Sequence, residues 1–480
     1  MNYKMILYTI GQILKVEALL MLISLIVSLI FQDGMYMSFI IPFLIILFVS
    51  FIFTVRKPKN TTIYAKEGFI VVGLSWIALS LFGCLPFIIS KSIPNFINAF
   101  FETVSGFTTT GATILNDVEV LAKSINFWRL FTHWIGGMGV LVFTLAVLPN
   151  SDGNSIHLLR AESPGPQVGK LVSKIRKTAR ILYLIYICLS LLQMLFLVCG
   201  DMNLYESIVH TFSTAGTGGL GIKNSSIAGY SSYSQIVIAV FMLLYGINFN
   251  IFYLFILGQA KEVLKSEELK WYFGIILFSI VVITLNVYGL YNNLFETIKH
   301  SSFQVIAIIT TTGFATTDIG NWNSICQYIC LMLMIIGACA GSTGGGLKVS
   351  RFVIFLKAIK MEIKGLLHPN TVNTLKFEGK PLNQNEVHSI SVYFGFLLLL
   401  AFGISFIISV DGLPLITNIS ATFSCINNIG PLIGPDGSWL GNYDSFSGFS
   451  KLVLAMTMMV GRLEIFPIIV LFSKKTYLNK

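Results

Sequence analysis

Charged side chains are scarce in this sequence. Only 11% of the 480 residues are Asp, Glu, Lys or Arg, whereas 55% are hydrophobic. A soluble domain carries about 25% charged residues, so this composition excludes an ordinary soluble globular protein. The mean hydropathy of +0.78 agrees with that exclusion. The chain is therefore predicted to be a polytopic membrane protein.

Cysteine is also scarce, and the groups needed for catalysis are missing. The seven cysteines are an odd number, lie mostly within apolar runs and form no Cys-x-x-Cys or Cys/His cluster. This pattern gives no support for a metal centre. We expect the cysteines to be small, buried hydrophobic side chains. Because no nucleophile–base pair stands out either, an enzyme is not expected. The chain has no Gly-x-Gly-x-x-Gly unit in a βαβ setting, so any nucleotide would have to bind a partner subunit.

Long apolar runs, in contrast, are abundant. A spanning helix needs about 20 apolar residues, and runs of that order lie at 5–31, 37–55, 67–90, 127–149, 181–200, 234–258, 271–291, 327–358, 388–410 and 449–473. The first run lacks a small-residue cleavage site after it, so it is predicted to be a retained helix. The run at 327–358 is too long for one span and is interrupted by a glycine-rich stretch, Gly341–Gly346.

Four shorter apolar segments alternate with these runs, and each leads into a polar turn. The segments lie at 95–107, 203–215, 295–310 and 413–427. They are too short to cross a bilayer, and their length suits re-entrant helices buried within the protein. The four turns align without gaps on a final glycine: Gly111, Gly219, Gly313 and Gly430. Two residues before it stands Thr109, Thr217, Thr311 or Asn428.

The repeated order of elements predicts the fold. We expect an all-α polytopic membrane protein in which four pseudo-repeats, each a helix, a re-entrant pore helix with its turn and a second helix, surround a central pore. Two further transmembrane helices precede them. The predicted units are 1–56 for the N-terminal hairpin and 57–150, 151–260, 261–365 and 366–480 for the four repeats, the third of which carries the glycine-rich loop.

Four such turns can bind a cation. The carboxyl-terminal end of each short helix carries a partial negative charge, and glycine allows the positive φ that inward-pointing carbonyls require. Rings of backbone carbonyls replace the hydration shell of the ion in potassium channels. Any one of these turns could be an ordinary connection, but four in register favour a selectivity filter. The predicted filter residues are Thr109, Thr110, Gly111, Thr217, Gly218, Gly219, Thr311, Thr312, Gly313, Asn428, Ile429 and Gly430.

The formal net charge of +10 follows from topology. If the N-terminus and the linkers 56–66, 150–180, 259–270, 357–387 and 474–480 lie on one side, that side holds 23 of the 32 Lys and Arg residues. The positive-inside rule makes this side cytoplasmic, with the short helices open to the exterior. Nucleic-acid binding is therefore not expected.

Two features lie below the predicted filter. The Gly341–Gly346 stretch, with Gly344, Gly345 and the following Lys348, has the wrong spacing for a phosphate-binding loop. Non-helical backbone within a membrane is tolerated where it lines a cavity, although a packing kink is an alternative. Arg462 lies within a predicted span, where a charge needs a partner or a wet cavity. Pairing with the loop is one possibility, whereas Glu464 at i+2 does not share its helix face.

These motifs resemble those of the TrkH/TrkG/KtrB/HKT superfamily of potassium transporters. The resemblance rests on Thr103–Ala112, Phe127–Gly139, Thr310–Phe314, Gly341–Gly346 and Gly461–Phe466, and it covers the chain from about residue 67. The two helices before residue 56 resemble the TrkH branch rather than the shorter KtrB branch.

The resemblance implies roles for particular residues. The four turn glycines would be the filter glycines, and Gly111 in place of the serine found in sodium-preferring relatives would favour K⁺. The fourth turn departs from the pattern because Asn427-Asn428-Ile429 lacks threonine hydroxyls. Gly341–Gly346 would be an intramembrane gate, and Arg462 would point into the pore as an electrostatic barrier.

The resemblance also implies the setting in which the protein works. It would be the ion-translocating subunit of a Trk-type system in the bacterial cytoplasmic membrane, with a cytoplasmic N-terminus, passing K⁺ and Rb⁺ inward. A homodimer and a TrkA-type cytoplasmic ring that binds nucleotides are implied as partners. H⁺- or Na⁺-coupled symport remains the alternative. The linkers 150–180 and 357–387 are candidate docking surfaces or simple topology signals.

Four further polar residues are weaker candidates for a functional role. We expect His133 to pack within a helix and Asn248 to serve helix packing rather than permeation. For His210 an outer-mouth role is conceivable. Glu102 could attract cations at the first short helix or could be a structural hydrogen-bonding residue.

Overall fold

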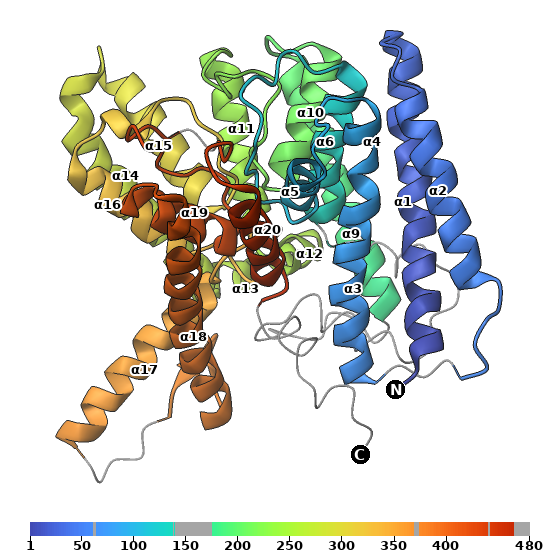
Figure 1. Cartoon of the computed structure of the whole chain (residues 1–480). Coiled ribbons are helices and arrows are strands. Elements are labelled where there is room, and N and C mark those ends of the chain that lie inside the picture. The colour runs from blue at the N-terminus through green and yellow to red at the C-terminus, as the bar shows by residue number, and fades with distance from the viewer. Residues whose placement is uncertain (61–63, 138, 140–174, 369–373, 440–441, 465–480) are drawn as a thin grey trace.

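The computed structural model describes residues 1–60, 64–137, 139, 175–368, 374–439 and 442–464. Helices dominate these residues (Figure 1). In chain order they are α1 (Tyr3–Phe31), α2 (Met37–Thr54), α3 (Ala65–Gly83), α4 (Leu85–Ile89), α5 (Phe96–Phe107), α6 (Lys123–Gly137), α9 (Ile175–Val198), α10 (Leu204–Ala215), α11 (Ser232–Tyr245), α12 (Phe249–Ile256), α13 (Ala260–Lys265), α14 (Glu267–Val287), α15 (Leu294–Ile309), α16 (Ser324–Ile335), α17 (Val349–Leu367), α18 (Gln384–Ile408), α19 (Leu415–Asn427) and α20 (Gly448–Arg462).

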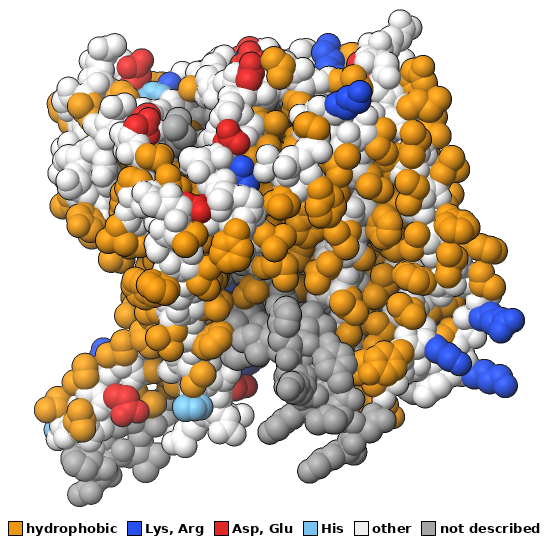
Figure 2. Space-filling view, in the orientation of Figure 1, with side chains coloured by type: hydrophobic (Ala, Val, Ile, Leu, Met, Phe, Trp, Pro, Cys, Tyr) orange, Lys and Arg blue, Asp and Glu red, His pale blue; other side chains and the backbone are white. Residues whose placement is uncertain are grey.

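The membrane-spanning character predicted from composition is confirmed. Within the described part of the chain, six helices are long and apolar enough to cross a membrane, and a bent pair of helices adds a seventh candidate span. Over α1 and α2 the exposed side chains are hydrophobic along the middle of the helices, and Lys and Arg lie near their ends (Figure 2). This surface suits contact with lipid acyl chains, which offer no partner for charge.

The N-terminal hairpin is a closely packed pair attached to the first repeat. Gly11 on α1 lets α2 approach, because a methyl group added there would lie 2.8 Å from the Cβ of Phe53. The Ser50 hydroxyl donates to the Gly11 carbonyl at 2.6 Å. At the other end of the hairpin, Asp33 accepts a 2.9 Å hydrogen bond from the backbone N–H of Ser124 at the start of α6. These contacts fix the hairpin against the helices of the first repeat.

The same order of elements occurs four times after the hairpin. A long helix is followed by a short helix and then by a second helix: α3–α5–α6, α9–α10–α11, α14–α15–α16 and α18–α19–α20. The short helices coincide with the four predicted segments to within two residues at either end. Their turns lie in the upper half of Figure 1, whereas the N-terminus and the free end of α17 lie at the bottom. The all-α, four-unit architecture expected from the sequence is thus observed.

One predicted span differs in detail, and another is interrupted as expected. The run 234–258 is two helices, α11 and α12, bent by 90° at residues 246–248. The bend has a local cause: Asn248 caps α12 by accepting from the N–H of Asn250 at 3.0 Å, and Gly246 closes α11. The run 327–358 is α16 and the first part of α17, separated by non-helical backbone over 336–348, which confirms the interruption predicted at Gly341–Gly346. Parts of the runs 127–149 and 449–473 lie outside the described residues.

A small feature was not anticipated from the apolar runs. Between α17 and α18, strands β1 (Lys376–Phe377) and β2 (Lys380–Pro381) form a two-stranded antiparallel hairpin. Its turn residues Glu378 and Gly379 have φ values of +49° and +72°, the left-handed pair that tight hairpin turns require. The buried ring of Phe377 anchors this hairpin to the core.

Candidate ion-conduction site

Each of the four short helices ends in a turn of the same geometry. In every case the residue before the final glycine donates its N–H to the carbonyl five residues earlier. The donor–acceptor pairs are Thr110–Ser105 at 2.9 Å, Gly218–Ser213 at 2.8 Å, Thr312–Ala307 at 2.8 Å and Ile429–Ser424 at 2.9 Å. The fourth turn, which lacks threonine, makes the same bond. Side-chain chemistry therefore varies while the backbone path is kept.

The backbone of each turn is left-handed at two positions. The final glycines have φ values of +80°, +67°, +82° and +104° at Gly111, Gly219, Gly313 and Gly430. The residues two positions earlier are also left-handed: Thr109, Thr217, Thr311 and Asn428 have φ values of +53° to +56°. A β-branched residue adopts this region only under constraint. Such strain persists where surrounding structure enforces it, and it concentrates at functional sites.

The four turns close into a ring. A methyl group added to Gly111 would lie 1.8 Å from the carbonyl oxygen of Gly218 in the second turn. A methyl group added to Gly219 would lie 1.8 Å from the Thr312 oxygen, and one added to Gly313 would lie 2.1 Å from the Ile429 oxygen. A methyl group added to Gly430 in the fourth turn would lie 2.7 Å from the Thr110 oxygen in the first turn. Each glycine thus admits the carbonyl of the next turn, and no larger residue fits.

A second ring of contacts surrounds the outer side of the turns. The first and second repeats join where Asn224 accepts from Val118 N–H at 2.9 Å. Contacts that join the other neighbouring repeats are Ile227 N–H to Ala315 O at 3.1 Å, Trp439 N–H to Asp318 at 2.9 Å and Tyr443 N–H to Thr113 O at 2.7 Å. Each of the four junctions between neighbouring repeats therefore carries its own hydrogen bond.

A buried ion pair braces the first two turns. Glu102 on α5 and Arg129 on α6 are each 1% exposed, and the Arg129 Nε donates to Glu102 at 2.6 Å. Glu102 also accepts from the Ile114 N–H at 3.0 Å, just beyond the first turn. Arg129 Nη1 donates to the Gly221 carbonyl at 3.2 Å, just beyond the second turn. Of the two roles considered for Glu102, the geometry favours the structural one, since its charge is neutralised at close range.

The two histidines lie behind the turns rather than on the surface. His133 is fully buried, and a methyl group on Gly218 would lie 2.0 Å from its Nδ1. His210 is fully buried as well, and its Nε2 lies 3.1 Å from the Tyr230 hydroxyl. His133 thus backs the second turn from α6, in keeping with a packing role. The buried position of His210 does not fit an outer-mouth role.

Below the ring, the second helix of each repeat ends close to the turns. Methyl groups added to Gly136 and Gly461 would lie 1.9 Å from the Phe107 oxygen and 2.0 Å from the Ile426 oxygen. A methyl group added to Gly246 would lie 3.0 Å from the Thr310 side chain. In the third repeat the glycine-rich segment, rather than a glycine of the second helix, approaches the turns. Close approach to the turns is therefore made from all four repeats.

The glycine-rich loop lies directly under the third and fourth turns. Gly345 donates its N–H to the Thr311 hydroxyl at 2.7 Å. A methyl group added to Gly345 would lie 2.5 Å from the Asn427 oxygen, so glycine is required for this approach. The buried ammonium of Lys348 donates to the carbonyls of Gly344 and, at 3.3 Å, Gly345. The loop thus folds its own carbonyls around a cationic group beneath the turns.

Arg462 joins three repeats at the same level. It ends α20, and its Nη1 donates to the Thr343 carbonyl of the loop at 2.9 Å. Its Nη2 donates to the carbonyls of Gly136 at 2.6 Å and Gly137 at 2.9 Å. The nearby carboxylate of Glu464 pairs with Arg351 on α17. Of the alternatives weighed from the sequence, pairing of Arg462 with the loop is observed.

Asn248 connects the bent second repeat with the loop. As the cap of α12 it lies 3.0 Å from where a side chain on Gly341 would begin, and the next N–H, of Phe249, donates to the Gly341 carbonyl at 3.0 Å. Its role is local capping and packing, as expected. The loop is therefore held from the second, third and fourth repeats.

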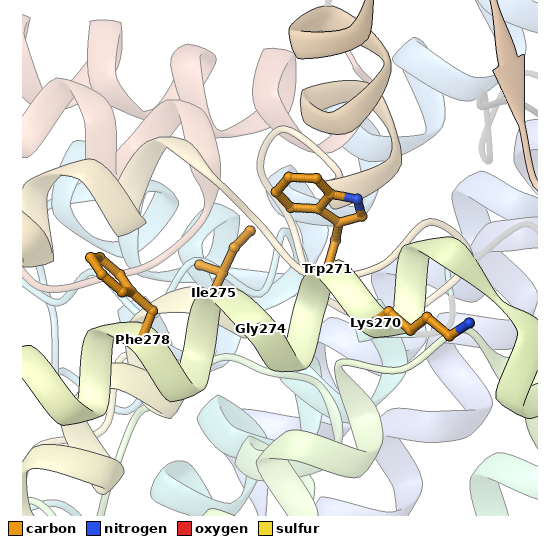
Figure 3. A pocket seen from close by; sticks show the side chains of 5 residues that line it. All are labelled: Lys270, Trp271, Gly274, Ile275 and Phe278. Carbon is orange, nitrogen blue, oxygen red and sulfur yellow. The ribbon is translucent and has the colours of Figure 1, made fainter.

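A groove on the surface is unrelated to this site. It is a cavity of about 380 Å³ lined by Lys270, Trp271, Gly274, Ile275 and Phe278 (Figure 3). All five residues lie on α14, and none contributes to the turns or the loop. Among the described residues no group of three or more His, Cys, Asp or Glu side chains is placed to hold a metal ion.

The sequence matches the family described as TrkH, cation transport protein, over residues 36–477. The chain belongs to this family. The match begins before residue 67, so it includes part of the N-terminal hairpin. The chain is 33% identical to the Trk system potassium uptake protein TrkH of Escherichia coli K12 over 98% of its own length and 99% of that protein. It is 32% identical to TrkG of the same strain, with 96% of each chain covered.

A solved structure agrees with this family membership. The crystal structure of the potassium transporter TrkH from Vibrio parahaemolyticus aligns with a TM-score of 0.89 and 29% identity, and 100% of both chains is covered. The similarity therefore extends over the hairpin and all four repeats.

The brace between Glu102 and Arg129 generates a stability prediction. Arg129→Ala leaves the Glu102 carboxylate buried and unpaired, which costs about 3–5 kcal/mol in known cases. We expect a large drop in the thermal midpoint of the detergent-solubilised protein, measured by fluorescence-detected size exclusion after heating. Lys265→Ala, which removes one partner of an exposed pair, is the control and should change the midpoint little. Equal midpoints for Arg129→Ala and the parent protein would contradict the bracing role.

Proposed function

We propose that this protein conducts K⁺ across the bacterial cytoplasmic membrane through the ring of four turns, as the ion-translocating subunit of a Trk-type uptake system. The observation that carries the proposal is the closed ring of left-handed turns, in which each glycine admits the carbonyl of the next turn. A ring of fixed carbonyl dipoles can replace the hydration shell of a weakly hydrated cation. The relatives are named potassium uptake proteins, which supports K⁺ as the cargo.

The arrangement beneath the ring supports a closed gate. Gly344 and Gly345 approach the third and fourth turns, and the cationic groups of Arg462 and Lys348 lie at the same level. Positive charge at the exit of a cation pathway raises the barrier to permeation. Movement of the loop away from the turns, with loss of the Arg462 contacts, would open the path.

The orientation and partners belong to the same proposal. The N-terminus, α17 and the β1–β2 hairpin lie at the end of the molecule opposite the turns (Figure 1), and the positive-inside rule places that end in the cytoplasm. A second copy of this chain, in a homodimer, and a cytoplasmic nucleotide-binding ring would then contact the 357–387 linker. The linker 150–180 lies almost entirely outside the described residues.

Coupled symport is the competing function. Glu17 on α1 is the observation in its favour, since this carboxyl is 2% exposed and its oxygens have no hydrogen-bond partner within the described part of the chain. It lies beside Gly83 of α3, whereas the cation ligands are in the four turns. The geometry therefore favours an uncoupled pore.

Flux measurements separate these two functions. We expect Rb⁺ uptake into proteoliposomes without Na⁺ and with the pH gradient clamped, driven by the K⁺ gradient alone. Glu17→Gln should leave the rate and its pH dependence unchanged. Uptake that requires Na⁺ or a proton gradient would contradict the uncoupled pore.

The first filter glycine provides a test of selectivity. A serine at Gly111 must shift the Gly218 carbonyl, because the space beside Gly111 is filled. We expect Gly111→Ser to lower the K⁺/Na⁺ permeability ratio by about tenfold, equivalent to about 1.4 kcal/mol in relative ion stabilisation. Gly403→Ser, on α18 with open space around it, is the matched control. An unchanged ratio in folded Gly111→Ser protein would rule out this ring as the filter.

The gate can be tested by releasing its contacts. Arg462→Ala removes three hydrogen bonds to carbonyls, and deletion of Gly344–Gly346 removes the segment beneath the turns. Both changes should raise the basal Rb⁺ flux of the purified chain. Lys265→Ala, on the exposed surface of α13, should not. Basal flux at the parent level in both variants would argue against a closed gate at this position.

A further inference from the structure

The base of the glycine-rich loop is pinned by one buried carboxylate. Glu268, in the first turn of α14, is 4% exposed. Its Oε1 accepts from the N–H of Ala340 at 2.7 Å and from the N–H of Ser350 at 3.1 Å. Ala340 comes just before the loop and Ser350 just after it. A single oxygen atom therefore holds both ends of the segment together.

The backbone beneath the loop is closed by a short ladder as well. Gly337 donates to the Leu347 carbonyl at 2.7 Å, and Val349 donates to the Ala338 carbonyl at 3.2 Å. The ladder and the Glu268 contacts form one clasp, defined here by residues 336–340, 347–350 and Glu268. Hydrogen bonds to a charged acceptor are stronger than those between neutral groups, so Glu268 contributes the strongest part of the clasp.

Glu268 is itself positioned from outside the membrane-spanning helices. Its backbone N–H donates to the Glu378 carboxylate at 3.0 Å, and the Ser266 hydroxyl donates to the same oxygen at 2.9 Å. Glu378 belongs to the β1–β2 turn and has a φ of +49°. A non-glycine residue in this region is held there by its surroundings. The hairpin thus caps the first turn of α14, where a negative charge is favoured.

A parallel contact links the hairpin to the helix that follows the loop. Lys357 on α17 forms an ion pair with Glu267 and donates to the Lys376 carbonyl of β1 at 2.9 Å. The hairpin, the start of α14 and α17 therefore form one connected unit. A displacement of the hairpin would pull on Glu268 and on α17 together.

We propose that Glu268 is the positioning residue of the glycine-rich loop, and that Glu378 on the hairpin holds Glu268 in place. Force applied to the hairpin by a cytoplasmic partner would withdraw the Glu378 cap, tilt the start of α14 and release the clasp. This inference rests on the proposal that the loop is the gate. It adds the route by which a change on the 357–387 linker reaches the pore.

The test uses the full purified chain in proteoliposomes, with Rb⁺ as the permeant ion and no partner protein. Glu268→Ala should raise basal flux by about tenfold, because bonds to a charged acceptor contribute at least that factor to an equilibrium. Glu268→Gln keeps an acceptor oxygen and should restore part of the closure. Glu378→Ala should raise flux less, and the double variant should match Glu268→Ala. Glu262→Ala, which removes an exposed acid on α13, is the control and should leave flux unchanged.

A second measurement reports the loop without relying on flux. Cys339 lies within the clasp and is fully buried, whereas Cys188 and Cys199 are exposed. Labelling with N-ethylmaleimide, read by peptide mass spectrometry, should become faster at Cys339 in Glu268→Ala and Glu378→Ala, with Cys199, which lies just beyond the end of α9, as the internal reference. If Glu268→Ala fails to fold, Glu378→Ala decides alone: faster labelling supports the proposal, and the parent rate overturns it.

The outcomes distinguish this inference from the gate on which it rests. Suppose that the Gly344–Gly346 deletion raises flux but Glu268→Ala changes neither flux nor Cys339 labelling. The proposal that Glu268 positions the loop is then overturned, whereas the proposal that the loop is the gate is supported. If neither change raises flux but Cys339 labelling increases, Glu268 positions the loop and the loop is not the gate, so the proposed route to the pore is overturned.

Discussion

The left-handed backbone of the four turns is the constraint on which the rest of the structure depends. Two residues in each turn have positive φ, and four of these eight positions are occupied by threonine or asparagine rather than glycine. Strain of this kind, about 1–3 kcal/mol per residue, has to be imposed by the surroundings. The pore helices, the i→i−5 hydrogen bonds and the outer ring of contacts between repeats supply that support. The arrangement places backbone oxygens around one axis inside a membrane protein.

Support for the ring is distributed unevenly among the repeats. The junction of the first and second turns has the buried pair Glu102–Arg129, whereas the fourth turn has Tyr443, whose hydroxyl donates to the Gly430 carbonyl at 3.0 Å. In the third repeat Gln304 donates to the Thr317 carbonyl at 3.0 Å. These groups differ in chemistry but each ties the segment after a turn to its own repeat or a neighbouring one. A common backbone path is thus maintained by side chains that share no motif.

The sequence predicts much of this architecture because the governing signals are local. The length of an apolar segment decides whether it can cross a bilayer, and the four glycines mark the turns directly. The left-handed threonines were not predicted, since threonine carries no signal for positive φ. The bend at Gly246–Asn248 was missed because hydropathy is continuous across it. Pairing of Arg462 with the loop was one of the possibilities, but its contacts with Gly136 and those of Glu268 could not be predicted, because each partner lies more than 70 residues away and is a backbone group.

The central claim is that the ring of four turns binds the permeant ion through backbone oxygens. The most direct test is crystallographic or cryo-electron microscopic density for Rb⁺ in protein prepared with Rb⁺ in place of K⁺. The account predicts density on the axis between the carbonyls of Thr110, Gly218, Thr312 and Ile429. Well-ordered turns without ion density between them, with Rb⁺ found instead at another place within the membrane-spanning region, would contradict it.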